Sequence, residues 1–139
     1  MIETYKHSGE GYNPFLIGSK WQIAQLNYSL DEALESKNRL DIHHKTDEAF
    51  LLIDGEAILI AAKIDKDLIS YDMQKMIPGI VCNIPKKVWH NIVLEPGAKV
   101  LIVEDMNTHL PLPEGDYDFH YFTDEQKSDF RNQITNLNR

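Results

Sequence analysis

The side chains best suited to metal chemistry gather in two stretches of this sequence. Asp41, His43, His44 and Glu48 lie close together in the first stretch, and His90 ends the second. A histidine followed by a carboxylate and then by a distant histidine suits a divalent cation bound by imidazole nitrogens and one oxygen. Two histidines and one carboxylate on one face leave coordination positions open for a substrate. The pattern therefore indicates a site for a divalent transition metal such as manganese, iron, nickel or zinc.

The elements that must position these residues are predicted to be short β-strands. Turn signals such as Asp54-Gly55 and Pro78-Gly79 separate apolar runs. Short strands at a spacing of roughly 8–12 residues, divided by Gly and Pro turns, are typical of an antiparallel sandwich or barrel. The expected strands cover residues 21–26, 48–53, 56–64, 68–73, 80–84, 88–94 and 99–104.

The N-terminal part of the chain is predicted to lie outside these strands. The first eighteen residues contain several glycines and an Asn-Pro pair, so they are expected to form an arm or loop. Residues 29–34 are expected to form a short helical turn with Ser29 as its N-cap.

The C-terminal part changes in composition and is predicted to cover the barrel. Residues 116–122 alternate acidic and aromatic side chains, which indicates an edge strand or a covering arm. Residues 123–126 fit a capping box, so residues 126–137 are predicted to form a terminal helix. His109 and His120 fall in this region and are expected to be solvated or to lie at an interface.

The two stretches resemble the two sequence motifs of the cupin superfamily. The first motif has six residues between a glutamate and a glycine, and the second spaces a glycine, a proline and a histidine along the chain. The matching residues are Glu48, Gly55, Gly79, Pro85 and His90. The chain departs from the second motif at Lys87, where the superfamily has a glycine. The sequence also looks like a subgroup of small bacterial cupins, through His43, Thr46, Asp47, Glu48, Trp89, His90, Val103 and Glu104.

This resemblance implies an all-β fold, a cupin jelly-roll β-barrel with an N-terminal arm and a short C-terminal helix. Residues 1–139 are expected to form a single cupin domain, with the barrel at about 20–105 and a C-terminal extension at 106–139. Small cupins commonly form dimers by exchanging strands or arms, so a homodimer is expected.

The resemblance also implies a set of metal ligands. These are His43, Glu48 and His90, with Asp41 and Glu104 as candidate further ligands. Sequence leaves open whether His43 or His44 faces the pocket. His43 is preferred because the subgroup pattern has its histidine there and because Asp41 then shares the same strand face.

The alternation of side chains along a strand is an independent argument about where the His90 and Glu104 side chains point. His90 and Glu104 each share a strand face with apolar neighbours, so both are expected to point into the barrel. Phe50 and Trp89 are expected to line the ligand pocket, although packing in the core or rim is the commoner role of such residues.

Composition limits the classes of partner. The 139 residues include 14 basic and 22 acidic side chains, a net charge of −8, which gives no general attraction for nucleic acids or anionic membranes. No apolar run is long enough to cross a membrane, and no signal peptide is apparent, so a cytoplasmic protein is expected. The single cysteine, Cys82, cannot form an intramolecular disulfide and excludes cysteine-rich zinc sites.

Three functions follow from these observations. The first is binding of a divalent metal and a small polar ligand inside the barrel, with no organic cofactor. The second is a metal-free enzyme similar to sugar epimerases and isomerases, in which a histidine–carboxylate pair moves a proton. The third is a non-catalytic module that binds a small molecule. Sequence alone does not decide whether the protein is an enzyme.

Overall fold

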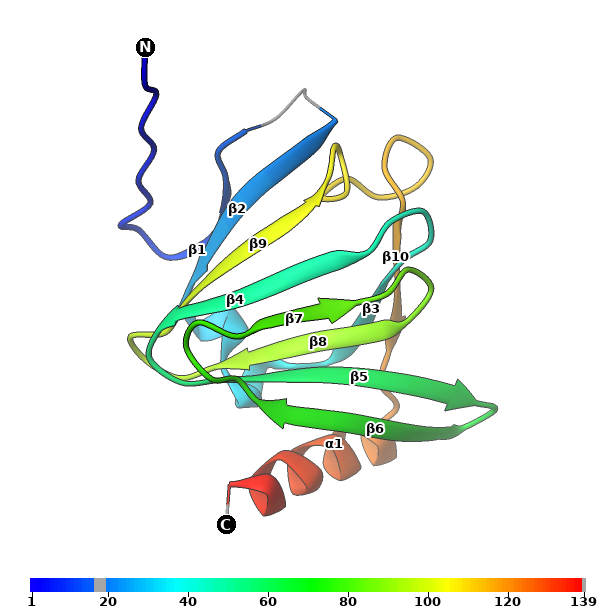
Figure 1. The fold of residues 1–139 in the computed structure, drawn as a ribbon. Coiled ribbons are helices and arrows are strands. Elements are labelled where there is room, and N and C mark those ends of the chain that lie inside the picture. Colours follow the sequence, from blue (N-terminus) through cyan, green and yellow to red (C-terminus); the bar gives the residue numbers. More distant parts are fainter. Residues whose placement is uncertain (17–19, 139) are drawn as a thin grey trace.

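Two antiparallel β-sheets face each other, and one helix packs on the outer side of the second sheet (Figure 1). The computed structural model describes residues 1–16 and 20–138. The first sheet has the order β1-β2-β9-β4-β7 and consists of Gly11–Pro14 (β1), Trp21–Asn27 (β2), Lys99–Asp105 (β9), Glu48–Asp54 (β4) and Val81–Ile84 (β7). The second has the order β10-β3-β8-β5-β6 and consists of Tyr117–Tyr121 (β10), Arg39–His43 (β3), Trp89–Leu94 (β8), Ala57–Asp65 (β5) and Leu68–Lys75 (β6). Two short 3-10 helices, Leu30–Glu32 and Leu34–Ser36, connect β2 to β3.

The main apolar core lies between the two sheets and follows the alternation of side chains along the strands. In β5, Ala57 and Leu59 belong to this core, whereas Ile58 and Ile60 pack on the outer side beneath the helix. Both faces of the first half of β5, residues 57–60, are therefore buried. Burial on both faces explains why this segment is a nearly continuous apolar run rather than an alternating one.

Helix α1 (Asp124–Leu137) confirms the predicted terminal helix and its capping box. The Thr123 hydroxyl accepts the backbone N–H of Gln126 at 3.1 Å, and the Gln126 side chain accepts the backbone N–H of Thr123 at 3.0 Å. Phe130 and Ile134 are fully buried against the outer face of the second sheet. No helix in the described part of the chain is long and apolar enough to cross a bilayer.

The seven predicted strands are all present, with ends that differ by one or two residues, and the all-β jelly-roll prediction is confirmed. Residues 117–121 form an edge strand, β10, in agreement with one of the two predicted alternatives. The agreement reflects the Gly and Pro turns, which mark strand ends locally.

Three local expectations need correction. Residues 11–14 of the expected arm form β1, which pairs with β2 in antiparallel register; residues 17–18 of that arm lie outside the described residues. Ser29 makes no side-chain capping bond, and the helical turn after it is a 3-10 helix. Residues 39–43 form β3, a strand outside the seven expected ranges, although Asp41 and His43 are expected to share a strand face. Its polar residues face the barrel interior, which reverses the usual pattern.

Candidate metal centre

The strand register brings the predicted site residues to one cavity. Asp41 of β3 lies directly opposite His90 of β8 in the second sheet. Glu48 of β4 lies directly opposite Glu104 of β9 in the first sheet. These four side chains and His43 line a cavity of about 560 Å³ between the sheets. Each sheet therefore contributes a pair of cross-strand neighbours to the same site.

Three of these side chains form a compact group of nitrogen and oxygen donors. The Nε2 atom of His43 lies 2.9 Å from Oε2 of Glu48, and the Nε2 atom of His90 lies 3.0 Å from the same oxygen. The three donor atoms lie within 4.8 Å of one another, and all three residues are buried. One carboxylate oxygen thus faces two imidazole nitrogens from different strands.

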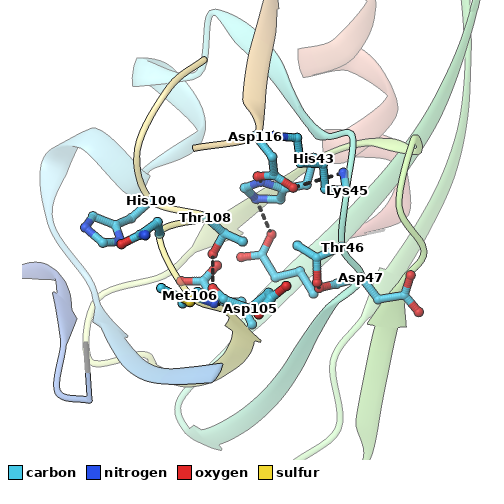
Figure 2. Close-up of polar contacts among 12 residues, drawn as sticks. His43, Lys45, Thr46, Asp47, Asp105, Met106, Thr108, His109 and Asp116 are labelled. Carbon is cyan, nitrogen blue, oxygen red and sulfur yellow. Dashed lines mark hydrogen bonds and ion pairs between the residues drawn. The ribbon is translucent and has the colours of Figure 1, made fainter. Parts of the chain in front are cut away.

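The other nitrogen of each imidazole has a partner outside this group. The Nδ1–H of His43 donates to Oδ1 of Asp116 at 2.9 Å, and the Nδ1–H of His90 donates to the carbonyl oxygen of Val88 at 3.0 Å. Asp116 is itself held by the backbone N–H of Lys45 at 3.0 Å, and Figure 2 shows it beside His43. Since both acceptors are oxygens, Nδ1 carries the proton in each ring, and Nε2 is the atom available to a metal.

The turn before β8 holds His43 and His90 in place relative to each other. Lys87, at the glycine position of the second motif, has a φ of 66°, so its backbone keeps the left-handed conformation that usually favours glycine. Its N–H donates to the carbonyl oxygen of His43 at 2.7 Å. His44 is not among the described residues that line the cavity, and the structure therefore places His43, not His44, at the site.

Burial and charge act in opposite directions on these groups. Burial opposes protonation of His43, but its contacts with Glu48 and Asp116 outweigh burial and raise its pKa to about 9. Burial likewise opposes protonation of His90, whose pKa is nevertheless raised by Glu48. Burial disfavours the charged form of Glu48, yet the two histidines lower the pKa of this carboxyl. A divalent ion would have to displace protons here, because imidazole ligates only in its neutral form.

Asp41 and Glu104 line the cavity but stand outside the three-residue group. Oδ1 of Asp41 lies 3.0 Å from Nε of Arg39. Glu104 accepts hydrogen bonds from the Tyr12 hydroxyl and from Gln22. Burial, followed by the charge of Glu48, raises the pKa of Glu104. Glu104 therefore has hydrogen-bond partners of its own, whereas Asp41 Oδ1 has the charge of Arg39 beside it but accepts no hydrogen bond from the described residues.

The two aromatic residues expected in the pocket lie in different places. Phe50 lines the cavity, 3% exposed, beside the ring of His90. Trp89 is on the opposite face of β8 and packs edge-on against His120, with ring centroids 6.2 Å apart. The expectation that Trp89 lines the pocket is corrected by strand alternation, because its neighbour His90 faces inward.

Four residues of the cavity region were not predicted from sequence. Tyr12 and His109 line the cavity, and Gln22 joins them, with its Nε2 atom 3.1 Å from the Tyr12 oxygen and 3.1 Å from Nδ1 of His109. Asp116 supports His43 from the segment before β10. The expectation of a solvated or interface role for His109 is therefore corrected. No local motif marks these positions, since strands β1 and β2 and two loops bring them to the site from distant parts of the chain.

The donor set fits a divalent transition metal. Two imidazole nitrogens and one carboxylate oxygen match the ligand preferences of iron, manganese, nickel and zinc. The fixed Nδ1 atoms of His43 and His90 are the outer-shell feature that ligating histidines usually have. His43, Glu48 and His90 are the residues that would hold the ion.

Replacing Asp116 by asparagine is expected to weaken metal binding by about 10- to 100-fold, because outer-shell partners of ligating histidines typically contribute that much. The change removes the charge that faces His43 Nδ1–H but keeps the shape of the side chain. Competition titration with a coloured chelator would measure the affinity. Asp118→Asn, at an exposed position on β10, is the matched control. Equal affinities for the two variants would contradict the prediction.

The metal-free protein is expected to lose stability as the pH rises from 6.5 through about 9. The pKa of His43 rises from 6.5 to about 9 on folding, so its protonation stabilises the fold fully below pH 6.5 and less as the pH approaches 9. A bound metal replaces the proton, so the loaded protein should keep its Tm over this range. Thermal unfolding with and without chelator measures both profiles. In the metal-free His43→Gln variant, stability should fall less as the pH rises over this range. An unchanged fall would show that other groups cause the pH dependence.

Comparisons with known proteins bear on the fold. Family models and curated protein sequences give no match. Among solved structures, the chain resembles FeII HppE with 16% identity and a TM-score of 0.51, covering 68% of this chain and 48% of that one. A cupin superfamily protein from Desulfitobacterium hafniense matches with 16% identity and a TM-score of 0.49, covering 76% and 84%. A cupin-2 domain protein from Shewanella frigidimarina matches with 21% identity and a TM-score of 0.48, covering 70% and 83%.

These likenesses concern the fold. The chain spans about half the length of FeII HppE, so the likeness covers one part of that protein. Together with the two facing five-stranded antiparallel sheets, the likeness to FeII HppE shows an all-β jelly-roll fold, the fold that the two cupin motifs indicated.

Proposed function

We propose that this protein binds a divalent transition metal through His43, Glu48 and His90 and holds a small polar ligand beside it. The observation that carries the proposal is the convergence of two Nε2 atoms on one Glu48 oxygen, at 2.9 and 3.0 Å, while both Nδ1 atoms are engaged elsewhere. Three protein ligands leave coordination positions for the second molecule. The fold neighbour HppE is described in its iron(II) form, in keeping with such a site.

The residues around the donors suit this role. A bound ion would supply Lewis-acid chemistry and polarise an oxygen of the ligand. Asp116 would keep the His43 ring oriented, and the Val88 carbonyl would do the same for His90. Phe50 and Ile102 would exclude water from the inner wall of the cavity, where both are buried.

Metal analysis tests the proposal directly. Protein purified without added metal, and then exposed separately to manganese, iron, nickel and zinc, is expected to retain close to one equivalent of at least one of them. His43→Ala should lose this metal, and His44→Ala is the matched control, because it changes the adjacent histidine outside the cavity. Retention below about a tenth of an equivalent of every metal would refute the proposal.

No specific observation favours the metal-free epimerase or isomerase. Such enzymes usually hold substrate phosphates with basic residues. Lys45, Lys86 and Lys87 are not among the described residues that line the cavity. Lys37 and Arg39 do line it, but each is paired with a carboxylate. The non-catalytic binding module would share the metal centre proposed here and would differ only in the absence of turnover.

A homodimer and a cytoplasmic location are further parts of this proposal. Apolar side chains on the outer face of the first sheet support the dimer, since helix α1 covers only the other sheet. Val81 and Val103 are 65% and 42% exposed there. Wild-type protein is expected to sediment as a dimer at micromolar concentration, and Val103→Asp should shift it toward monomer. A monomeric wild type would contradict the proposed dimer.

Fractionation of the source cells would test the proposed cytoplasmic location.

A further inference from the structure

A second polar cluster lies in the same cavity, apart from the three proposed metal ligands. It consists of Tyr12, Gln22, Glu104 and His109, and we call it the Glu104 cluster. Strand β1 contributes Tyr12, β2 contributes Gln22, and β9 with the segment after it contributes the other two. Figure 2 shows Thr108 and His109 on that segment. Three separate parts of the chain therefore build the cluster.

The centre of this cluster is a buried carboxylate with spare capacity to accept hydrogen bonds. Glu104 is 5% exposed. The Tyr12 hydroxyl and the Gln22 amide, at 2.8 Å for the latter, both donate to its Oε1 atom. The Thr108 side chain also lies within hydrogen-bonding reach of this carboxylate. A carboxylate offers about four acceptor positions on its two oxygens, so three donors still leave Glu104 able to accept one more. The group that fits such a position in a cavity is a hydroxyl or an ammonium group of a ligand.

The charge of the cavity points to the same kind of ligand. The charged side chains that line it are Asp31, Glu32, Asp41, Glu48, Glu104, Lys37 and Arg39. Five acids and two bases give a formal charge of −3 with both histidines neutral, and a divalent ion would bring it to −1. If Glu104 is protonated as well, the total with the divalent ion is zero. The metal-loaded cavity therefore has no net positive charge, whether Glu104 is charged or neutral.

The two basic side chains are already paired. Nζ of Lys37 lies 2.7 Å from a Glu32 oxygen, and Nε of Arg39 lies 3.0 Å from Asp41. A ligand carboxylate or phosphate would have to break one of these pairs to reach a cation of the protein, and the His43 ring is likewise held between the carboxylates of Glu48 and Asp116. Leaving a carboxylate without its partner in a partly buried site is unfavourable. An anionic ligand is therefore disfavoured in the part of the cavity away from the three proposed metal ligands.

We infer that the ligand is a neutral or cationic polyhydroxylated compound, of the polyol, sugar or amino-sugar class, with a hydroxyl or ammonium group donating to Glu104. The metal end of this arrangement rests on the proposed function, whereas the Glu104 end rests on the cluster and the cavity charge. A cavity of about 560 Å³ lies within the size range of small-molecule sites and accommodates a hexose. Glu104 is in this view a specificity residue.

Three matched hexoses test the inference. Glucosamine, glucose and glucuronate share one ring and differ in charge, and each is titrated calorimetrically into zinc-loaded and zinc-free protein at neutral pH. We expect glucosamine and glucose to bind at least about ten-fold more tightly than glucuronate. The carboxylate of glucuronate would be repelled by the acidic side chains of the cavity and would find no free basic side chain among the described residues there. Glucuronate binding as tightly as glucosamine would overturn the inference, and so would the absence of measurable binding by both favoured sugars.

Variants separate the Glu104 end from the metal end. Glu104→Gln should weaken glucosamine binding about ten-fold or more while leaving zinc content unchanged, because it removes the charge but keeps the shape. Glu95→Gln, at an exposed turn, is the matched control. Unchanged glucosamine affinity in Glu104→Gln would overturn the inference. Failure of the proposed function would instead appear as wild-type protein that takes up no zinc, and the hexose preference of the zinc-free protein would then still test Glu104.

Discussion

Glu48→Gln is expected to reduce bound metal from about one equivalent to below about a tenth under conditions that saturate the wild type. One oxygen of Glu48 faces both His43 and His90, and the negative charge of this side chain would offset the charge of the ion. Glutamine keeps the length of the side chain but is a neutral and far weaker ligand. We expect the metal affinity to fall by more than about 100-fold, beyond the typical effect of an outer-shell change.

Metal content after dialysis, measured by mass spectrometry, checks this expectation. Glu56→Gln, an exposed position just after the β4–β5 turn, should leave the content unchanged. Circular dichroism would establish that Glu48→Gln is folded before its metal content is compared. Full metal retention by folded Glu48→Gln would contradict the prediction, because the ion would then be bound at another site.

Phe130→Ala is expected to lower the free energy of unfolding by about 3–5 kcal/mol, the usual range for removal of a fully buried aromatic ring. The Phe130 side chain is 0% exposed and packs between Tyr71 and Phe122, with ring centroids 5.6 and 5.1 Å away. It also contacts the apolar cluster on the outer face of β5, so its loss leaves a cavity beneath α1.

Urea unfolding followed by circular dichroism measures this difference. Asn132→Ala, on the exposed side of the same helix, should change stability by less than about 0.5 kcal/mol. The folded fraction of Phe130→Ala should still bind metal, because the helix covers the opposite side of the sheet from the cavity. Similar stabilities for the two variants would contradict the proposed role of this helix in holding the second sheet.

The strands and the terminal helix could be predicted because their signals are local. In β8, alternation places His90 with the buried Ile92 on the inner face, as parity predicted. The capping box of Thr123 and Gln126 needs only four consecutive residues, and both of its hydrogen bonds form. Strand β3 shows where alternation is misleading: Asp41 and His43 face a polar cavity, so the usual assignment of polar residues to solvent is reversed there.

Residue types and spacing determined which side chains can serve as donors, and strand parity determined the face on which each lies. Tertiary structure decided which faces meet. The opposition of Glu48 and Glu104 depends on strand register, and the contacts of Asp116 with His43 and of Tyr12 with Glu104 join residues 73 and 92 positions apart. Periodicity specifies the direction of a side chain but not the neighbouring strand or loop, which depends on how the whole chain closes around its core.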